Sequence, residues 1–417
     1  MDILENFFYS VFQTKGYCSS DRGKELFKNS TEDKTMKLVH VCLSGSYYDG
    51  WGYQENVLAE YNYKSGIDVY VVASQENYQN IHQQNTERVI RYEYNGVKVF
   101  RIPFINFLPE KISSKLKVYK GLLKVLVEID ADIIFFHGTI GMALNCIPKY
   151  KKKFPAKKIY IDNHADYYNC CQNVISKYFL YRGLWKYLIR RTLPYVEKYY
   201  GTLPIRNIFM QEVFKIPERK THLLIMGVDE TVLPQNSEKV RIKIRDKYQI
   251  SNDSFVIIAG GKIDVNKNFD KLMDAVNGLK NERIVLFIFG NVVENYRKEF
   301  EKHMTENIIF AGWMSPNDIN ECFVASDLGI FPGLHSVLWE NACACQLPCI
   351  FHKLEGIDHV NVNGNCLLLE EVTTIGIQNA IKELIKNNGE KYMEMKMNAE
   401  IAKEKFLYKN IIKDFLG

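Results

Sequence analysis

One stretch, residues 327–351, constrains the fold of this chain more than any other. Its first residues are apolar enough for a short buried strand, which Pro332-Gly333 ends. Ser336 is a good N-cap for a helix that runs to about Cys345, where a Gln-Leu-Pro sequence stops it before a second apolar strand. This order predicts a parallel βαβ unit, with free helix amides beside the first strand's carboxyl end where an anion can bind.

The amino-terminal part of the chain shows a similar alternation. Residues 37–43 predict a buried strand, and a glycine-bearing loop that contains Gly52 and Tyr53 leads into a helix over about 54–65. A strand over 69–73 follows, and this order is typical of the opening of a nucleotide-binding fold. The glycine spacing is not G-x-G-x-x-G, so it does not by itself indicate a dinucleotide. A surface loop is the alternative interpretation.

Histidines follow two of the predicted strands. The strand over 132–136 ends at His137, and the strand over 157–162 is followed by His164 and Asp166. Because ligands on open parallel sheets bind beyond the carboxyl ends of the strands, we expect these side chains to line a site. Histidines hydrogen-bonded within ordinary loops are the alternative.

Two lysines mark the start of the second half of the chain. Residues 255–261 predict a strand that ends in two glycines, and Lys262 and Lys267 follow in a loop that enters a helix. Two cations at this spacing can clamp a diphosphate, although two surface lysines are the alternative. Two further strands also end in glycine turns, which contain Gly290-Asn291 and Trp313-Met314.

Length and composition bound the function. A chain of 417 residues suggests two or three domains, and a net charge of +5 does not predict a nucleic-acid partner. The ten cysteines lack the paired C-x-x-C spacing of a zinc site, and we expect reduced core thiols. No signal peptide or long apolar run is evident, so we expect a cytoplasmic protein without a membrane-spanning helix.

Two basic and aromatic stretches, residues 148–158 and 177–191, contain no acidic residue. Such faces suit anionic lipid headgroups and favour a peripheral position on the inner face of a membrane. Solvated charge over an ordinary core helix is the alternative. Residues 1–35 are a polar extension without a readable function, and Met36 could be an alternative start.

The segment Glu340–Pro348, Glu-Asn-Ala-Cys-Ala-Cys-Gln-Leu-Pro, resembles the donor-binding segment of retaining glycosyltransferases of family 4, which reads Glu-Ala-x-Ala-x-Gly-x-Pro. Residues 226–229 resemble the Gly-Val-Asp that closes the family's first domain. Lys267 matches the family's lysine, and Lys262 stands in place of its arginine, which keeps the charge but loses the bidentate fork.

The chain departs from this family in the first half of the motif. The family's Glu-x7-Glu would need a carboxylate at position 332, where this chain has Pro332. The loop is also shorter, with His335 and Ser336 in place of the family's glycine-rich turn. The usual first sugar-binding glutamate is therefore absent.

The resemblance implies the α/β GT-B fold, in which two Rossmann-like domains face a cleft and a carboxyl-terminal helix crosses back to the first domain. The expected parts are an N-terminal extension over 1–35, an acceptor domain over 36–235, a nucleotide-sugar domain over 236–400 and the crossing helix over 401–417.

The resemblance also implies transfer of a sugar from a nucleotide diphosphate donor, with a UDP-sugar favoured, and with retention of configuration. The acceptor would be a glycan, a lipid-linked glycan or a protein, as in bacterial surface polysaccharide synthesis. We expect no cofactor and no metal, because no Asp-x-Asp motif stands near a strand end. The catalytic candidates are His164, Asp166, Lys262 and Lys267; the donor-binding candidates are Gly52, Tyr53, Gly261, Gly290, Asn291, Trp313, Met314, His335, Ser336, Val337, Leu338 and Glu340.

Other functions stay open at this point. The missing first glutamate suggests a non-catalytic GT-B subunit that supports a partner glycosyltransferase. A nucleotide-sugar 2-epimerase would share the fold but would need no acceptor. An interaction protein without enzymatic activity is a further alternative.

Overall fold

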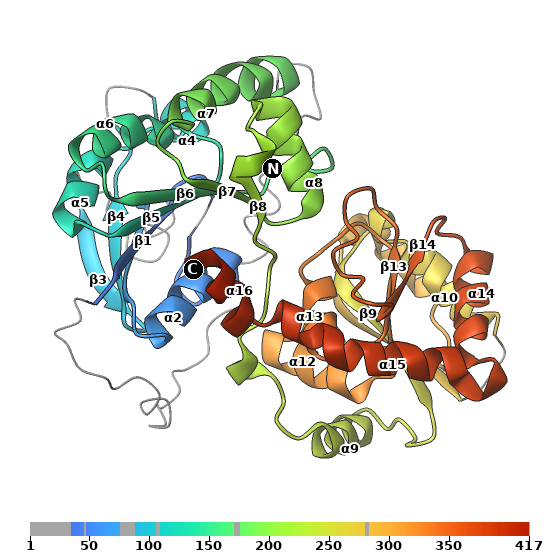
Figure 1. Cartoon of the computed structure of the whole chain (residues 1–417). Helices are drawn as coiled ribbons and strands as arrows, with labels where there is room; N and C mark the ends of the chain where they lie inside the picture. Colours follow the sequence, from blue (N-terminus) through green and yellow to red (C-terminus); the bar gives the residue numbers. More distant parts are fainter. Residues whose placement is uncertain are drawn as a thin grey trace. The chain divides into compact units, whose positions relative to one another are not determined.

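The structure is a computed structural model that describes residues 35–45, 47–75, 88–105, 109–170, 176–279 and 283–416. The predicted extension, apart from residue 35, lies outside this described part. Internal contacts divide the chain into two compact units. The first comprises residues up to 165 with 171–199 and 213–216, and the second comprises 166–170, 200–212 and 217–417. Figure 1 shows that each is a twisted sheet flanked by helices.

The first sheet is built from near-continuous apolar strands, as expected where helices cover both faces of a sheet. Its strands are β1 Lys37–Cys42, β2 Asp68–Ser74, β3 Ile90–Tyr94, β4 Val97–Ile102, β5 Ile133–His137, β6 Lys158–Asn163, β7 Lys198–Gly201 and β8 Thr221–Leu223. The strand order is β3-β4-β2-β1-β5-β6-β7-β8. β1 pairs in parallel with β2 and β5, β2 with β4, and β5 with β6, whereas β3 runs antiparallel to β4.

The helices that precede β8 in the chain are α2 Gln54–Lys64, α4 Glu110–Leu116, α5 Leu122–Ile129, α6 Cys146–Lys153, α7 Lys186–Thr192 and α8 Pro204–Phe209, with a π-helical segment, η2, at Ser176–Trp185. Figure 1 shows α6 and α7 on one side of the sheet and α2 on the other. The parallel order brings the carboxyl ends of β1, β5 and β6 together at one edge. His137 and His164 both come from that edge.

The second sheet has the order β11-β10-β9-β12-β13-β14, and all of its paired strands are parallel. The strands are β9 Phe255–Ile263, β10 Ile284–Val292, β11 Ile308–Phe310, β12 Leu328–Phe331, β13 Cys349–His352 and β14 Cys366–Leu369. The helices are α9 Ser237–Lys247, α10 Phe269–Asn277, α11 Arg297–Lys302, α12 Pro316–Ala325, α13 Leu338–Ala344, α14 Thr374–Ile385, α15 Glu390–Ala402 and α16 Tyr408–Leu416.

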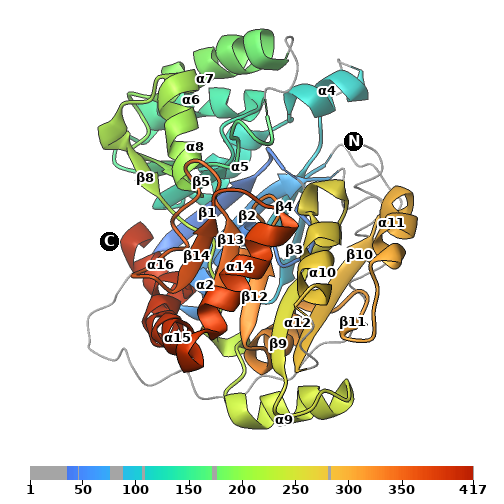
Figure 2. The same ribbon diagram turned by 90° about the vertical axis from the view of Figure 1, so that its right-hand side faces the viewer.

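Helices cover both faces of the second sheet. On one face, α10 and α14 bury an aliphatic core that includes Ile257, Leu272 and Ile381, each fully buried. On the other face, Trp339 of α13 stacks on Phe351 of β13 with ring centroids 4.5 Å apart. Figure 2 shows α10 and α14 lying across the strands of this sheet. The predicted α/β class with two Rossmann-like sheets is confirmed.

Backbone breaks separate neighbouring helices at two places. α4 and α5 are distinct because Lys117 and Gly121, which lie between them, adopt φ values of 53° and 82°. α16, which lies within the range predicted for the crossing helix, is separate from α15 because Leu407 is extended and bridges to Val228. Among the described helices, none is long and apolar enough to cross a bilayer.

The helix expected to begin at Ser336 also differs from its prediction. α13 begins at Leu338, Val337 occupies the N-cap position, and no side chain caps the helix. The Ser336 carbonyl instead accepts a hydrogen bond of 3.0 Å from the amide of Trp339, which forms a turn ahead of the helix. The prediction of a Ser336 side-chain cap is therefore wrong, because the shortened loop leaves Ser336 inside that turn.

β9 and β10 approach each other most closely at two glycines. Gly290 pairs with Gly261 in register, and its φ of 128° lies in the region that favours glycine. A Cβ at Gly290 would lie 1.9 Å from the Gly261 carbonyl oxygen. Any side chain at this position would therefore force the strand ends apart.

We predict that Gly290→Ala lowers the free energy of unfolding by about 3 kcal/mol or more, because it adds both backbone strain and a clash with backbone. Gly312→Ala is the matched control: Gly312 also has a positive φ, of 72°, but no atom lies within 4 Å of its Cβ position. That variant should lose about 1–2 kcal/mol. Urea denaturation measures both losses, and equal losses would contradict the close approach.

Candidate functional site

The predicted donor-binding residues of the second unit gather at the carboxyl edge of its sheet. Lys262 lies opposite Asn291 in the β9–β10 register, one position beyond the glycine pair. The Gly290 amide donates a hydrogen bond of 2.7 Å to the Gly312 carbonyl, which brings the loop containing Trp313 to the same edge. α13 joins them, because Leu338 lies against Gly261.

The two lysines occupy different environments in this group. Lys262 is half-exposed, and its Nζ lies 3.1 Å from a carboxylate oxygen of Asp264. Lys267 is more buried, and its ammonium donates to the Leu334 carbonyl. Burial lowers the pKa of Lys267, and the nearby Lys262 charge lowers it further against the opposing effect of Asp264. Both lysines follow the glycine pair at the carboxyl end of β9, where a diphosphate clamp is predicted.

Glu340 has no exposed surface. Its Oε1 lies 2.9 Å from Nε2 of His335 and 2.8 Å from Nε2 of His359. Oε2 is buried and has no hydrogen-bond partner among the residues that the structure describes. Burial alone would raise the pKa of Glu340, but His335 and His359 outweigh it and hold that pKa well below its usual value. The carboxylate is therefore ionised, with one oxygen able to accept a further hydrogen bond.

The His335, Glu340 and His359 group has the ligand types of a metal site. However, both histidine nitrogens lie within 3 Å of the same carboxylate oxygen, which is hydrogen-bonding distance. Ligands around a tetrahedral zinc ion, with bonds of about 2 Å, must stand farther apart than this. The geometry therefore fits a hydrogen-bonded triad better than a metal centre.

Trp313 is exposed, whereas its neighbour Met314 is buried. Trp313 is 47% exposed, so it is not a core residue. Met314 is 7% exposed and contributes to packing. Of this pair, only the Trp313 ring has the exposed surface that a ligand would need.

At the carboxyl edge of the first sheet, His164 lies between two carboxylates. Its Nε2 is 3.4 Å from Asp162 Oδ1 on β6 and 3.8 Å from Glu55 Oε1 on α2. The His164 side chain is 34% exposed, whereas Asp162 is fully buried. Gly52 and Tyr53 directly precede α2, and both are exposed. These residues form a separate group of candidate residues at the carboxyl edge of the first sheet.

Asp166 does not have the surroundings expected of a catalytic acid. It is 3% exposed, and it accepts hydrogen bonds of 2.9 Å from the amides of Tyr168 and Asn169. Its other oxygen accepts from Nε of Arg206 at 3.0 Å. These contacts explain Asp166 as a loop-stabilising residue, so the structure does not support the catalytic role predicted for it.

Sequence reasoning missed several polar residues that the structure brings to these sites. His359 follows Glu340 by 19 residues in an irregular loop, and no pattern marked it. Asp162 stands at the end of a predicted strand, so the strand-end argument applied to the histidines could have found it. Glu55 was missed because it is an acidic residue in the first turn of α2, where such residues are common.

Known proteins resemble this chain in sequence and in fold. Residues 240–402 match the family described as Glycosyl transferases group 1. A curated relative is alpha-galactosylglucosyldiacylglycerol synthase of Streptococcus pneumoniae, 22% identical over 288 residues, which cover 64% of this chain and 75% of the relative.

Solved structures resemble the whole chain. A glycosyltransferase from Rickettsia africae has a TM-score of 0.67 at 14% identity, over 92% of this chain and 97% of that one. Anabaena Alr3699/HepE in complex with UDP and glucose has a TM-score of 0.61 at 16% identity, over 91% and 98%. The two-sheet architecture is that of the GT-B glycosyltransferases. The chain is a glycosyltransferase of the hexosyltransferase type.

We predict that Glu340→Gln lowers the free energy of unfolding at pH 7 by about 2–3 kcal/mol, because two histidines lose a charged acceptor. A carboxyl whose pKa is depressed by folding stabilises the fold above its unfolded pKa of about 4.3, and this contribution is lost as the pH falls. The difference between the proteins should therefore shrink below about pH 4.5.

Urea denaturation from about pH 3 to pH 8 would measure this difference, with Glu371→Gln as the control because Glu371 is exposed. A loss that is the same at every pH would contradict an ionised Glu340.

Proposed function

We propose that the chain transfers a hexose from a nucleotide diphosphate donor, with UDP favoured, to a glycan or lipid-linked acceptor with retention. The observation that carries this proposal is the grouping of Lys262, Lys267 and the ionised Glu340 at one sheet edge. Ammonium groups stabilise the charge that develops on a leaving diphosphate, and a carboxylate accepts hydrogen bonds from ribose hydroxyls. UDP is favoured because Anabaena Alr3699/HepE was solved with UDP and glucose.

Each donor-side residue has a role in this proposal. Lys267 binds the diphosphate, and Lys262 adds charge where the glycosidic bond breaks. Glu340 is assigned to the ribose, as the family resemblance implies, and because its Oε2 is buried, ribose binding there requires the covering side chains to move. Trp313 offers an exposed ring to the base. His164 serves near the transferred sugar and the acceptor, as the family resemblance implies. No metal-dependent step is assigned to any of these residues.

A panel of UDP- and GDP-sugars tests the proposal. One donor should bind and be slowly hydrolysed without an acceptor, and a glycan or lipid-linked acceptor should accelerate its turnover. Neither binding nor turnover of any donor would favour the non-catalytic subunit. Conversion of the sugar without its release would favour the 2-epimerase.

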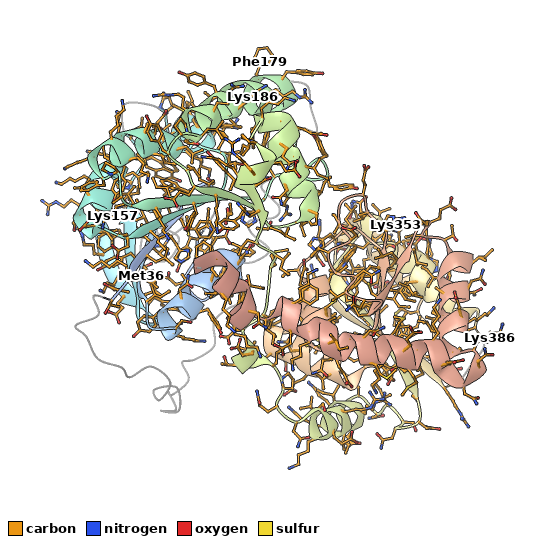
Figure 3. The ribbon with its side chains drawn as sticks, viewed as in Figure 1. Met36, Lys157, Phe179, Lys186, Lys353 and Lys386 are labelled. Atoms are coloured by element: carbon orange, nitrogen blue, oxygen red, sulfur yellow. The ribbon has the colours of Figure 1, made fainter. Side chains whose placement is uncertain are left out.

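The first unit carries a surface that suits a membrane-bound acceptor. Phe179 of η2 and Tyr187 of α7 are 72% and 59% exposed. Figure 3 shows Phe179 and Lys186 at the same end of the first unit, on neighbouring helical segments. Arg182 and Arg190 are exposed on the same segments, and no acidic residue occurs between residues 172 and 196.

Exposed rings flanked by cations favour the interface of an anionic bilayer. We infer that η2 and α7 bind the inner face of a membrane peripherally and bring the site to a lipid-linked acceptor. The name of the Streptococcus pneumoniae relative, which is that of a glycolipid synthase, supports a lipid acceptor. The proposal therefore places the protein in the cytoplasm, at the membrane surface, without a nucleic-acid partner.

We predict that Lys267→Ala weakens UDP binding by roughly 1.5–3 kcal/mol, because a charged hydrogen bond is lost. Uridine affinity should not change, since uridine has no diphosphate. Titration calorimetry with both ligands separates the two effects. Lys386→Ala is the control, because Lys386 is exposed after α14 (Figure 3). Unchanged UDP affinity would refute the assigned clamp.

We also predict that Phe179→Ser combined with Tyr187→Ser lowers binding to phosphatidylglycerol-containing vesicles by roughly tenfold, because two rings no longer enter the interface. Cosedimentation measures this binding. Ile375→Ser is the control, since Ile375 is 68% exposed in the second unit. Binding that is equal in all three proteins, or that needs no anionic lipid, would argue against this surface.

A further inference from the structure

The first unit contains a buried chain of polar side chains that the proposed function does not use. Nδ2 of Asn62 lies 3.1 Å from Nε2 of His40, and Nδ1 of His40 lies 2.8 Å from Nε2 of His137. Nδ1 of His137 lies 2.5 Å from Oδ2 of Asp162. All four residues are at most 3% exposed. They come from α2, β1, β5 and β6, so the fold rather than local sequence assembles the chain.

Hydrogen-bond directions along this chain agree with one another. The Asp162 carboxylate can only accept, so His137 donates from Nδ1 and, when neutral, accepts at Nε2. His40 then donates from Nδ1 and accepts at Nε2 from the Asn62 amide. Burial lowers the pKa of His40 well below its usual value, and His137 lowers it further, so His40 is neutral. The chain therefore runs from the Asn62 amide at one end to the Asp162 carboxylate at the other.

Asp162 connects this buried chain to His164. Its Oδ1 accepts from the Gly138 amide at 2.7 Å and lies 3.4 Å from Nε2 of His164. Burial would raise the pKa of Asp162, but His137 and His164 outweigh this effect and hold the pKa well below its usual value. Asp162 is thus an ionised carboxylate with donors on both oxygens, fixed between a buried histidine and a half-exposed one.

A second carboxylate approaches His164 from a different element. Oε1 of Glu55, in the first turn of α2, lies 3.8 Å from the same Nε2. Cys42 on β1 is also near both carboxylates, and burial followed by the charges of Glu55 and Asp162 raises the pKa of that thiol against the opposing effect of Arg101. Cys42 is therefore a neutral thiol, and the fixed charges facing Nε2 of His164 are negative.

We propose that Asp162 and Glu55 are positioning residues for His164, and that His137, His40 and Asn62 hold Asp162 in place. This inference rests on the proposed role of His164 near the transferred sugar. The carboxylates keep the proton on Nε2, so His164 gains and loses its titrating proton at Nδ1. They also favour the imidazolium over the neutral ring.

The proposal makes a prediction whose direction does not depend on which form of His164 is active. Removing a carboxylate lowers the pKa of His164, by about one unit or more for Asp162 and by less for the more distant Glu55. If the imidazolium is active, the alkaline limb of kcat moves to lower pH; if the neutral ring is active, the acid limb does.

The experiment uses Asp162→Asn and Glu55→Gln in the full chain. NMR titration of the His164 ring gives its pKa without reference to activity, and pH profiles of kcat follow. Glu55 is only half-buried, so we expect Glu55→Gln to fold. This variant tests the proposal even if Asp162→Asn does not fold. Asp68→Asn, at the amino end of β2, is the control and should leave the His164 titration unchanged.

The outcomes separate this inference from the proposed function. A lower His164 pKa in the folded variants supports the positioning role. An unchanged His164 titration in Glu55→Gln and in a folded Asp162→Asn overturns it. His164→Ala tests the underlying role separately, because full transfer activity in that variant would refute the assignment of His164 to the reaction, even if the titration shifts as expected.

Discussion

Close backbone approach at the carboxyl ends of β9 and β10 is the constraint on which the donor-side site depends. Because Gly261 and Gly290 carry no side chains, the two strands stay paired up to and beyond this point, where Lys262 faces Asn291. The Gly290 amide also binds the loop after β11, and Leu338 of α13 packs on Gly261. The shape of the backbone therefore determines where the charged side chains can stand.

Buried carboxylates bound by histidines occur in both units. Glu340 lies between His335 and His359 in the second unit, and Asp162 lies between His137 and His164 in the first. An isolated charge in the interior is costly, and it persists only when hydrogen-bonded partners compensate for lost water. Imidazole groups do so while restricting the orientation of the carboxylate, so each carboxylate is both charged and fixed.

The predictable part of the structure is the part encoded over short distances along the chain. Apolar runs, glycine turns and the positions of strand ends predict both sheets and the edge at which Lys262 and His164 emerge. Contacts between distant residues decide the rest. Glu340 is hydrogen-bonded in the interior by His359, which comes from a later loop. The Asp166 carboxylate is bound by Arg206, which lies 40 residues further along the chain. Neither partner leaves a periodic or motif signal in the sequence.

The loop before α13, which has Pro332 where the family has a carboxylate, packs directly on Lys267. Gly333 packs so tightly on Lys267 that a Cβ would lie 2.6 Å from its Cα. Lys267 donates to the Leu334 carbonyl, and the next residue, His335, holds Glu340. A diphosphate oxygen is a stronger acceptor for an ammonium group than a neutral carbonyl. In the proposed function, a bound diphosphate would take the Lys267 ammonium away from the Leu334 carbonyl. The resulting movement of the loop would reach Glu340 through His335, the residue after Leu334.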